Sequence, residues 1–251
     1  CKFIYLNPRP NSYSISSYYK SEYYDPHRNI NNIWSSVYKI IKSTMLRWKY
    51  SKISGISKAG KLLDIGGGNG DFAEFMSIKG WQVIMQDILL EKPINNSSYF
   101  YKKNLNQIYE NKTFDIITLW HSLEHIHNIK DLFDNINRLL APDGFLLIAV
   151  PNIYAPERKT LNIHWAPFDA PRHLYHFDPK TLKNLCGKYN FTILRKYSLF
   201  QDTPYNILLS IGKINIFQIL KATLLIIRSL FQTLLRGPNH SSSFLVICKK
   251  K

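Results

Sequence analysis

One glycine-rich stretch, residues 61–72, constrains the fold of this 251-residue chain more than any other part of it. Apolar residues lead into Asp64. Glycine then stands at every second position, at Gly66, Gly68 and Gly70. Glycine adopts backbone dihedral angles that other residues avoid, and without a Cβ atom it lets the backbone approach a ligand closely. Apolar residues at helical spacing follow, so the stretch predicts a buried strand, a tight turn and a helix.

The spacing of these glycines narrows the choice of ligand. A dinucleotide fingerprint needs G-x-G-x-x-G, and counting from Gly66 its last glycine would fall at Asp71, where a carboxylate is a poor neighbour for a diphosphate. A phosphate-binding loop would continue into Lys-Ser or Lys-Thr, and the stretch does not. The motif alone leaves open a plain strand-to-helix turn that binds nothing.

Both ends of the chain are basic, and the middle is nearly neutral. Residues 1–60 contain ten Lys and Arg against two Asp and Glu, residues 61–187 contain thirteen against fourteen, and residues 188–251 contain ten against one. Basic flanks suit an anionic partner such as a nucleic acid, a phospholipid surface or a phosphorylated substrate, although a solvated lysine-rich surface is equally compatible. The three cysteines are too few and too scattered for a disulfide framework, which predicts a reducing compartment, the cytoplasm.

Strands and helices are predicted to alternate along the chain. The expected strands are residues 61–65, 81–87, 99–101, 114–120, 145–150, 191–197 and 244–248. The expected helices are residues 33–53, one from the glycine turn to Gly80, one capped by Asp131 and one opened by Asp178 and Pro179. This order favours an α/β fold with a Rossmann-like, mostly parallel seven-stranded sheet that is covered on both faces.

Polar side chains gather where the predicted strands end. Asp87 lies 17 residues beyond Gly70, the spacing of a ribose-binding acid in an open α/β sheet, although a surface aspartate is the alternative. Six of the eight histidines fall between residues 121 and 176, after the fourth and fifth strands. Ligands bind at this edge in such sheets. The H-E-x-x-H order of zinc proteases is absent, and no metal is expected.

Several motifs in order resemble one protein family over about residues 60–197. The D-x-G-x-G-x-G stretch resembles motif I of class I S-adenosylmethionine-dependent methyltransferases. Residues 114–125, 139–144 and 172–177 resemble the branch that includes quinone-ring O-methyltransferases and bacterial enzymes found with cell-surface glycan biosynthesis. The resemblance implies that S-adenosylmethionine is the cofactor. It also implies a helical lid and loop over residues 1–57, a core over 58–203, an apolar and basic helical insertion over 204–237 and a final strand over 238–251.

The resemblance implies roles for individual residues. The cofactor would be bound by Asp64, Gly66, Gly68, Gly70, Asp87, Asn104, Trp120 and His121. If the acceptor is a hydroxyl, a histidine would remove its proton, and the candidates in order are His173, His125 and His121. The acceptor would contact Arg172, His176 and Trp165. Each histidine has the alternative of merely lining the pocket or forming a hydrogen bond there.

The resemblance also excludes some substrates. Enzymes that methylate the amino groups of adenine or glutamine carry [N/D]-P-P-[Y/F] after the fourth strand, where this chain has other residues, and cytosine enzymes need a Pro-Cys pair that it lacks. The expected acceptor is a small molecule, or one linked to a lipid or a glycan, methylated at oxygen; DNA is excluded. An RNA-directed enzyme, which lacks support from any RNA-binding module, and a non-catalytic cofactor-binding regulator remain as alternatives. We also expect the natural N terminus to lie upstream of Cys1, which could be the last ligand of a zinc ribbon.

The insertion carries a second pattern, over residues 206–236. Eight of its polar residues fall within less than half of a helical wheel, and they are Asn206, Ser210, Lys213, Gln218, Lys221, Arg228, Gln232 and Arg236. Three charges inside the run and the break expected at Gly212 argue against a membrane-spanning helix. The pattern is typical of a helix that lies in an anionic membrane interface, which predicts peripheral binding to the inner face of the membrane. A helical pair that packs on the sheet or across a dimer is the alternative.

Overall fold

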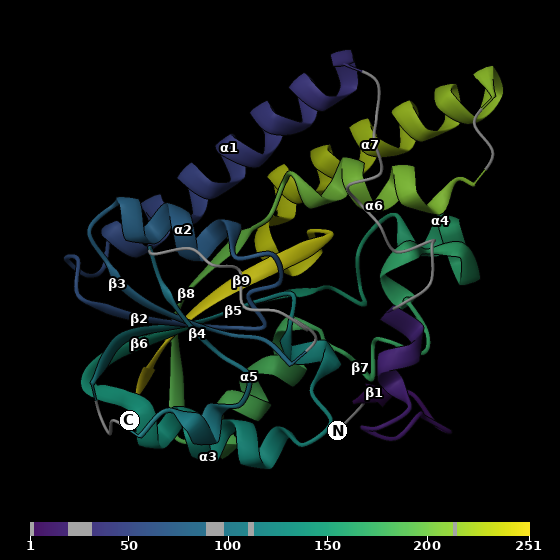
Figure 1. Cartoon of the computed structure of the whole chain (residues 1–251). Coiled ribbons are helices and arrows are strands. Elements are labelled where there is room, and N and C mark those ends of the chain that lie inside the picture. The colour runs from purple at the N-terminus through teal and green to yellow at the C-terminus, as the bar shows by residue number, and fades with distance from the viewer. Residues whose placement is uncertain (1–2, 20–31, 89–97, 110–112, 213–214) are drawn as a thin grey trace.

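The computed structural model describes residues 3–19, 32–88, 98–109, 113–212 and 215–251 (Figure 1). Cys1 and Lys213, which the sequence analysis singled out, lie outside these ranges. Seven strands form one sheet in the order β4-β3-β2-β5-β6-β9-β8. They are β2 (Lys61–Ile65), β3 (Gln82–Gln86), β4 (Phe100–Lys102), β5 (Phe114–Trp120), β6 (Leu140–Pro151), β8 (Phe191–Ser198) and β9 (Ser243–Lys250).

Only β9 runs against the direction of the other six strands, so the predicted mostly parallel, Rossmann-like sheet is confirmed. β6 begins earlier than predicted. Leu140 already pairs with Phe114, and the register shifts before Phe145 pairs with Ile116. The Pro-Asp-Gly sequence is a turn signal, so the strand was predicted to start after it, at residue 145. The irregularity in register lets the strand continue through this sequence instead.

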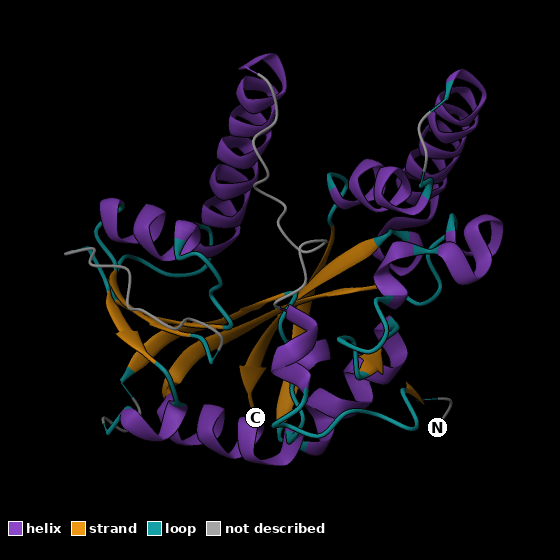
Figure 2. Cartoon of the chain, turned by 45° about the vertical axis from the view of Figure 1, so that its right-hand side comes forward, coloured by secondary structure: helices purple, strands orange, loops and turns teal. Residues whose placement is uncertain are grey.

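Helices cover both faces of the sheet (Figures 1 and 2). One face carries α1 (Asn32–Ser54) and α2 (Asp71–Ile78), and the other carries α3 (Ile129–Leu139) and α5 (Pro179–Lys188). The prediction that Asp131 caps α3 is wrong, because the side chain of Asn128 accepts the backbone N–H of Asp131 at 3.2 Å. Asp131 instead lies in the first turn of α3, where its negative charge interacts favourably with the positive end of the helix dipole.

The core consists of two apolar layers, one on each face of the sheet. Leu62 and Leu63 of β2 are both fully buried and belong to different layers, because successive side chains of a strand point to opposite faces. Leu63 packs in the layer of α3 and α5, and Leu62 packs in the layer of α1 and α2. Burial on both sides explains why the strand sequence is apolar without alternation.

A small second sheet joins the N-terminal segment to the histidine-rich loop. β1 (Ile4–Tyr5) pairs antiparallel with β7 (Tyr175–His176), and the N–H of Leu6 donates to the carbonyl of Leu174 at 2.9 Å. A 3₁₀ turn over Ile15–Tyr19 follows. The sequence analysis missed this sheet, because strands of two residues carry no detectable periodicity.

Two helices lie between β8 and β9, where the insertion was predicted. They are α6 (Asp202–Ser210) and α7 (Ile216–Arg236), and α4 (Arg158–Leu161) of the loop after β6 lies near them (Figure 1). Gly212, with a φ of 57°, follows α6 at the predicted break. α6 follows the carboxyl end of β8, so it starts at the carboxyl edge of the sheet, where the candidate site lies. From there it leads away to α7.

Candidate active site

The glycine turn after β2 is open on one side. Gly68 has a φ of 56°, and a Cβ atom placed on it would meet no atom of the described chain within 4 Å. The N–H of Gly68 donates to Oδ2 of Asp87 at 2.9 Å, so the end of β3 holds the turn in place. An exposed backbone next to a buried carboxylate at this edge fits a ligand that approaches the main chain closely.

Asp64 provides a buried carboxylate immediately before the turn. Its side chain is 2% exposed, and the Thr118 hydroxyl donates to Oδ1 at 2.6 Å. Burial raises the pKa of Asp64 to about 6, against the opposing effects of the Thr118 hydrogen bond and the charge of Lys49. A cationic ligand at this carboxylate would stabilise its ionised form.

Lys49 of α1 reaches the same place, although the sequence analysis did not identify it. Its Nζ atom lies 4.6 Å from the ring centroid of Trp120, a distance typical of a cation–π contact. Burial lowers the pKa of Lys49, and the charges of Asp64 and Asp202 act in the opposite direction. The predicted cofactor residue Trp120 and the acid Asp64 therefore already have the side chain of Lys49 as a neighbour. A ligand cation at Asp64 would have to share this environment with the amino group of Lys49.

His121 follows β5 with a φ of 53° and lies between two carboxylates. Its Nε2 atom is 3.0 Å from Oδ2 of Asp202, and its Nδ1 atom is 3.7 Å from Oε1 of Glu124. Burial alone would lower the pKa of His121, but these two carboxylates outweigh it and raise the pKa to about 10. His121 is therefore protonated at neutral pH and serves as a cation, which argues against the third-ranked candidate for the base.

Glu124, His125 and His173 form a compact group, here called the histidine cluster. Each offers one ligand atom within 4.8 Å of the others. Nδ1 of His125 lies 3.1 Å from the carbonyl oxygen of Arg172, and Nδ1 of His173 lies 2.8 Å from that of Pro167. A carbonyl only accepts, so Nδ1 of His173 carries the hydrogen and its Nε2 keeps the lone pair. Nδ1 of His125 also lies 2.9 Å from the hydroxyl of Tyr19, which can donate to it or accept from it.

Burial keeps the two imidazole rings of the histidine cluster neutral. It lowers the pKa of His125 to about 4 and also lowers the pKa of His173. Burial would raise the pKa of Glu124, but the interaction with the protonated His121 outweighs this effect and lowers the pKa. Two neutral imidazoles beside a carboxylate can accept a proton. They also have the donor types and the carbonyl bonds of a divalent cation site, although the sequence predicted no metal.

The structure brings Arg172 and His176 to the histidine cluster. Nη2 of Arg172 pairs with Oδ1 of Asp169 at 2.5 Å, and its carbonyl oxygen orients His125. The ring of His176 lies 6.4 Å from that of His173. Both predicted acceptor-binding residues therefore lie next to the candidate base.

Two other predicted residues lie apart from this group. Trp165 is 1% exposed and packs edge-on against Phe168 in a small apolar cluster of the loop after β6, so it does not line the edge with the histidines. Asn104 is exposed after β4, where it caps a 3₁₀ turn together with Gln107. Its place at the end of β4 is as predicted, and its contact with a ligand remains a prediction.

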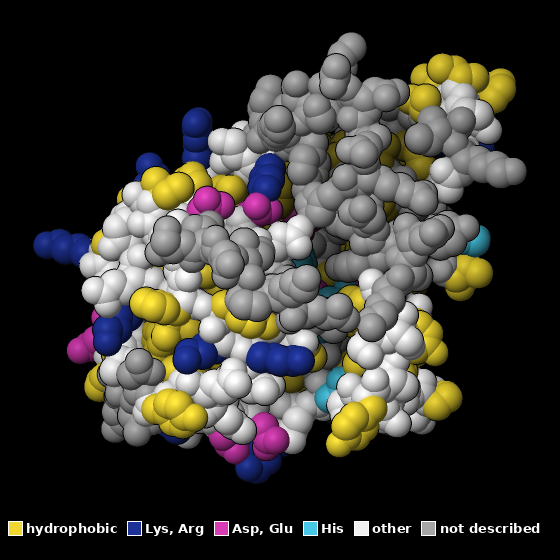
Figure 3. Space-filling model, in the orientation of Figure 1, with side chains coloured by type: hydrophobic (Ala, Val, Ile, Leu, Met, Phe, Trp, Pro, Cys, Tyr) yellow, Lys and Arg dark blue, Asp and Glu magenta, His cyan; other side chains and the backbone are white. Residues whose placement is uncertain are grey.

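A hydrogen bond ties the glycine turn to the segment that leads into the histidine cluster. The Ser122 hydroxyl donates to the carbonyl of Ile65 at 2.8 Å, and Glu124 and His125 follow it closely in the chain. Figure 3 shows histidine side chains in a recess near the centre of this face. Sequence reasoning missed Ser122 and Asp202, since neither carries a motif and Asp202 lies 81 residues after His121 along the chain.

The sequence of this chain is similar to a family model and to known proteins. The family model described as "Methyltransferase domain" matches residues 40–196. A ubiquinone biosynthesis O-methyltransferase of Pelagibacter ubique (strain HTCC1062) is 28% identical over 213 residues, 73% of this chain and 86% of that protein. A ubiquinone/menaquinone biosynthesis C-methyltransferase of Ectopseudomonas mendocina (strain ymp) is 28% identical over 112 residues, which is 39% of this chain and only 44% of that protein.

A solved structure shows the same fold. Phosphoethanolamine N-methyltransferase 2 of Haemonchus contortus, in complex with S-adenosyl-L-methionine, superposes with a TM-score of 0.62 at 16% sequence identity. The match covers 94% of this chain and 60% of that one. At this identity the likeness concerns the fold alone.

Proposed function

Since this chain belongs to the methyltransferase domain family and is an S-adenosylmethionine-dependent enzyme, we propose that it methylates a hydroxyl oxygen of a small acceptor. The open backbone at Gly68 and the buried carboxylate of Asp64 fit the cofactor. In this proposal Asp64 faces the ammonium end of the cofactor, and Asp87 faces its ribose. His121, held as a cation by Asp202, would bind an anionic group at the same edge.

The neutral histidine pair is the observation that carries the choice of oxygen. S-adenosylmethionine, when bound, supplies a methyl group that its sulfonium already makes electrophilic. The protein then has to orient the acceptor and remove its proton. Nε2 of His173 would take the hydroxyl proton as the acceptor oxygen is methylated. The proton stays on His173, where the negative charge of Glu124 stabilises it.

His173→Ala tests the base directly. We expect turnover to fall by roughly 10²–10⁴-fold, the usual range for one general base, with cofactor affinity nearly unchanged. The measurement compares ring-hydroxyl acceptors of different acidity. An acceptor that is already ionised at the assay pH needs no base, so its turnover should hardly change. Equal losses for neutral and ionised acceptors would contradict the proton transfer, and unchanged turnover for all of them would assign the role to His125 or remove the base.

The names of the two relatives support a small ring acceptor, since both act in quinone biosynthesis. The acceptor in this proposal is a small molecule, free or linked to a lipid or a glycan, and the enzyme works in the cytoplasm. The small number of scattered cysteines, of which Cys186 and Cys248 are buried, supports that compartment. Mass spectrometry of a candidate extract, before and after incubation with enzyme and cofactor, should find a product heavier by one methyl group.

A further inference from the structure

α7 turns its apolar side away from the protein. Large apolar residues that are 56–73% exposed fall within an arc of about 100° of the helix, and they are Ile216, Phe217, Leu220, Leu224, Ile227, Phe231, Leu234 and Leu235. α6 adds Tyr205, Leu208 and Leu209, each more than half exposed. Figure 3 shows hydrophobic side chains at the upper right, over the outer end of these two helices. Such a large exposed apolar patch marks an interaction surface.

The opposite side of α7 is small or polar, and it is the side that is buried. Ala222, Ser229 and Thr233 are at most 2% exposed, and no other residue of α7 is buried. The Thr233 hydroxyl donates to the carbonyl of Ser229 at 2.9 Å and lies 3.1 Å from that of His240, which precedes β9. The helix therefore meets the fold through small and polar residues, flanked by the partly buried Leu225, Ile226 and Leu230, and not through its exposed apolar arc.

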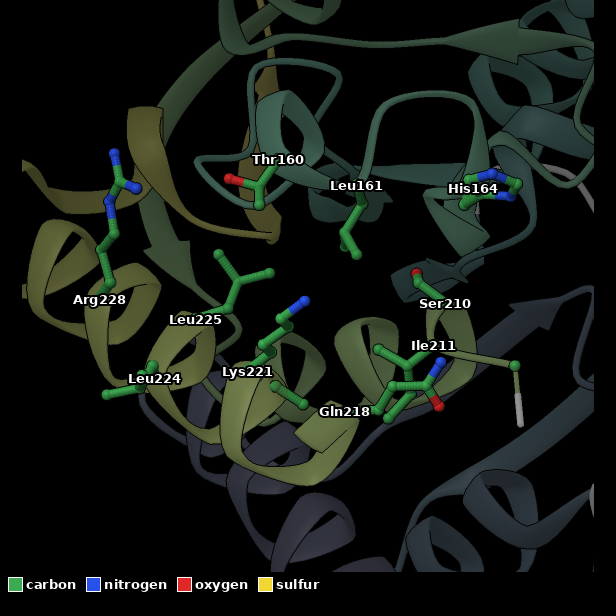
Figure 4. A pocket seen from close by; sticks show the side chains of 12 residues that line it. Thr160, Leu161, His164, Ser210, Ile211, Gln218, Lys221, Leu224, Leu225 and Arg228 are labelled. Carbon is green, nitrogen blue, oxygen red and sulfur yellow. The ribbon is translucent and has the colours of Figure 1, made fainter. Parts of the chain in front are cut away.

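Positive charge borders the apolar arc. Lys221 and Arg228 lie along one margin of it, and neither makes an ion pair within the described part of the chain. Residues 203–251 contain no Asp or Glu. The two cations also line a groove of about 690 Å³ between α7 and α4, in which Lys221 and Leu225 point toward Thr160 and Leu161 (Figure 4).

We propose that α7 docks this enzyme on an anionic lipid bilayer, with its apolar arc in the interface and Lys221 and Arg228 at the headgroups. An apolar face with basic margins is the pattern of helices that lie in the membrane interface. A second copy of the chain fits less well, because an antiparallel twofold contact through this face would bring the basic margins of both copies together, and residues 203–251 offer no carboxylate side chain to pair with them.

A membrane-spanning role also fits less well than docking. By length and composition alone, the helical stretch from Ile216 to His240 is sufficient to cross a bilayer. However, Ser229 and Thr233 pack against the fold, and Lys221 and Arg228 lie within the stretch rather than at its ends. Lying flat keeps these contacts and leaves the charges in water.

Docking would place the candidate site near the membrane. α6 begins at Asp202, the partner of His121, and ends at Ser210 beside the groove. The eight residue steps from Asp202 to Ser210 span about 12 Å, so the site lies within reach of a molecule held at the interface. This inference goes beyond the proposed reaction and does not depend on it.

Vesicle co-sedimentation of the full chain tests the docking without any turnover. We expect binding to vesicles of phosphatidylcholine with phosphatidylglycerol, weaker binding to phosphatidylcholine alone, and release by salt. Each basic residue near an anionic surface contributes about fivefold to binding, so Lys221→Gln with Arg228→Gln should lower it about 25-fold. Leu224→Ser with Phe231→Ser should lower it at least about tenfold, because both exposed side chains lose apolar area.

The matched control is Lys180→Gln with Lys183→Gln, the same charge change on exposed positions of α5, on the other face of the sheet. It should bind anionic vesicles almost as the wild type does. All these positions are exposed, and circular dichroism should find every variant folded. An equal loss in the control, or wild-type protein that remains in the supernatant with both lipids, would overturn the proposal. So would a dimer in sedimentation velocity that Leu224→Ser with Phe231→Ser splits, or binding that resists an alkaline carbonate wash.

Discussion

Asp64→Asn should stabilise the protein while it weakens cofactor binding. The folded-state pKa of Asp64, about 6, exceeds the ordinary value of 3.8, so folding penalises the ionised form. Protonated Asp64 therefore contributes stability below pH 3.8, and this contribution is lost as the pH rises through about 6. The difference of about two units corresponds to about 3 kcal/mol at neutral pH, without a discount for screening because the side chain is 2% exposed.

Urea denaturation at pH 7.5 measures the first effect. The amide that Asp64→Asn introduces cannot ionise, so the ligand-free variant should gain up to about 3 kcal/mol in free energy of unfolding, and the gain should shrink toward pH 4. Asp143→Asn makes the same chemical change on a carboxylate that is 96% exposed, and it serves as the control. A gain that is absent, or equally large at pH 4, would refute the argument that burial raises the pKa.

Calorimetry with S-adenosylmethionine measures the second effect. Binding that needs ionised Asp64 should weaken about tenfold at pH 5, one unit below its pKa. Asp64→Asn should weaken binding at pH 7.5 by about 1.5–3 kcal/mol, the typical value of a hydrogen bond to a charged group, and should lack the pH dependence. Wild-type affinity that stays constant from pH 8 to pH 5 would remove Asp64 from the cofactor site.

Further predictions concern the rest of the site. Gly68→Val should abolish S-adenosylmethionine binding, because the branched side chain fills the open side of the turn at a φ of 56°. Asp87→Ala should weaken binding by about 1–3 kcal/mol. Wild-type affinity in both variants would contradict the assignment of these residues to the cofactor site. Asp202→Asn removes the carboxylate 3.0 Å from His121, so an NMR titration should find the pKa of His121 well below about 10, and an unchanged pKa would assign the shift to another group. A chelator should leave turnover unchanged, whereas added Zn²⁺ should inhibit the enzyme by binding the histidine cluster. Inhibition by Zn²⁺ that persists in His125→Ala would show that the ion binds elsewhere.

Local sequence patterns predicted the fold and the glycine turn because both depend on residues close together in the chain. The succession of strands and helices along the chain follows from apolar runs that alternate with helical periods, and the turn follows from glycines where φ is positive. The cap of α3 shows where such reasoning fails. Asn128 and Asp131 are both good capping residues, and only the observed hydrogen bond distinguishes them.

The tertiary structure alone decided the charges of the site. His121 could be a base or a cation from its sequence, and the approach of Asp202 from α6 makes it a cation. The same holds for Lys49, one of several lysines on α1, which only the packing of that helix brings to Trp120 and Asp64. Electrostatic interactions depend on distances between residues that are far apart in the chain, and no local pattern contains these distances.

The orientation of α7 shows the same division. From the sequence alone, a helical wheel identified the polar stripe that contains Lys221 and Arg228 and the wide apolar remainder. It predicted a membrane surface without showing which side of the helix meets the fold. In the structure, Ser229 and Thr233 pack inward and the apolar arc faces outward. A wheel describes which residues share a side of a helix, whereas the direction of that side is set by the contacts that bury it.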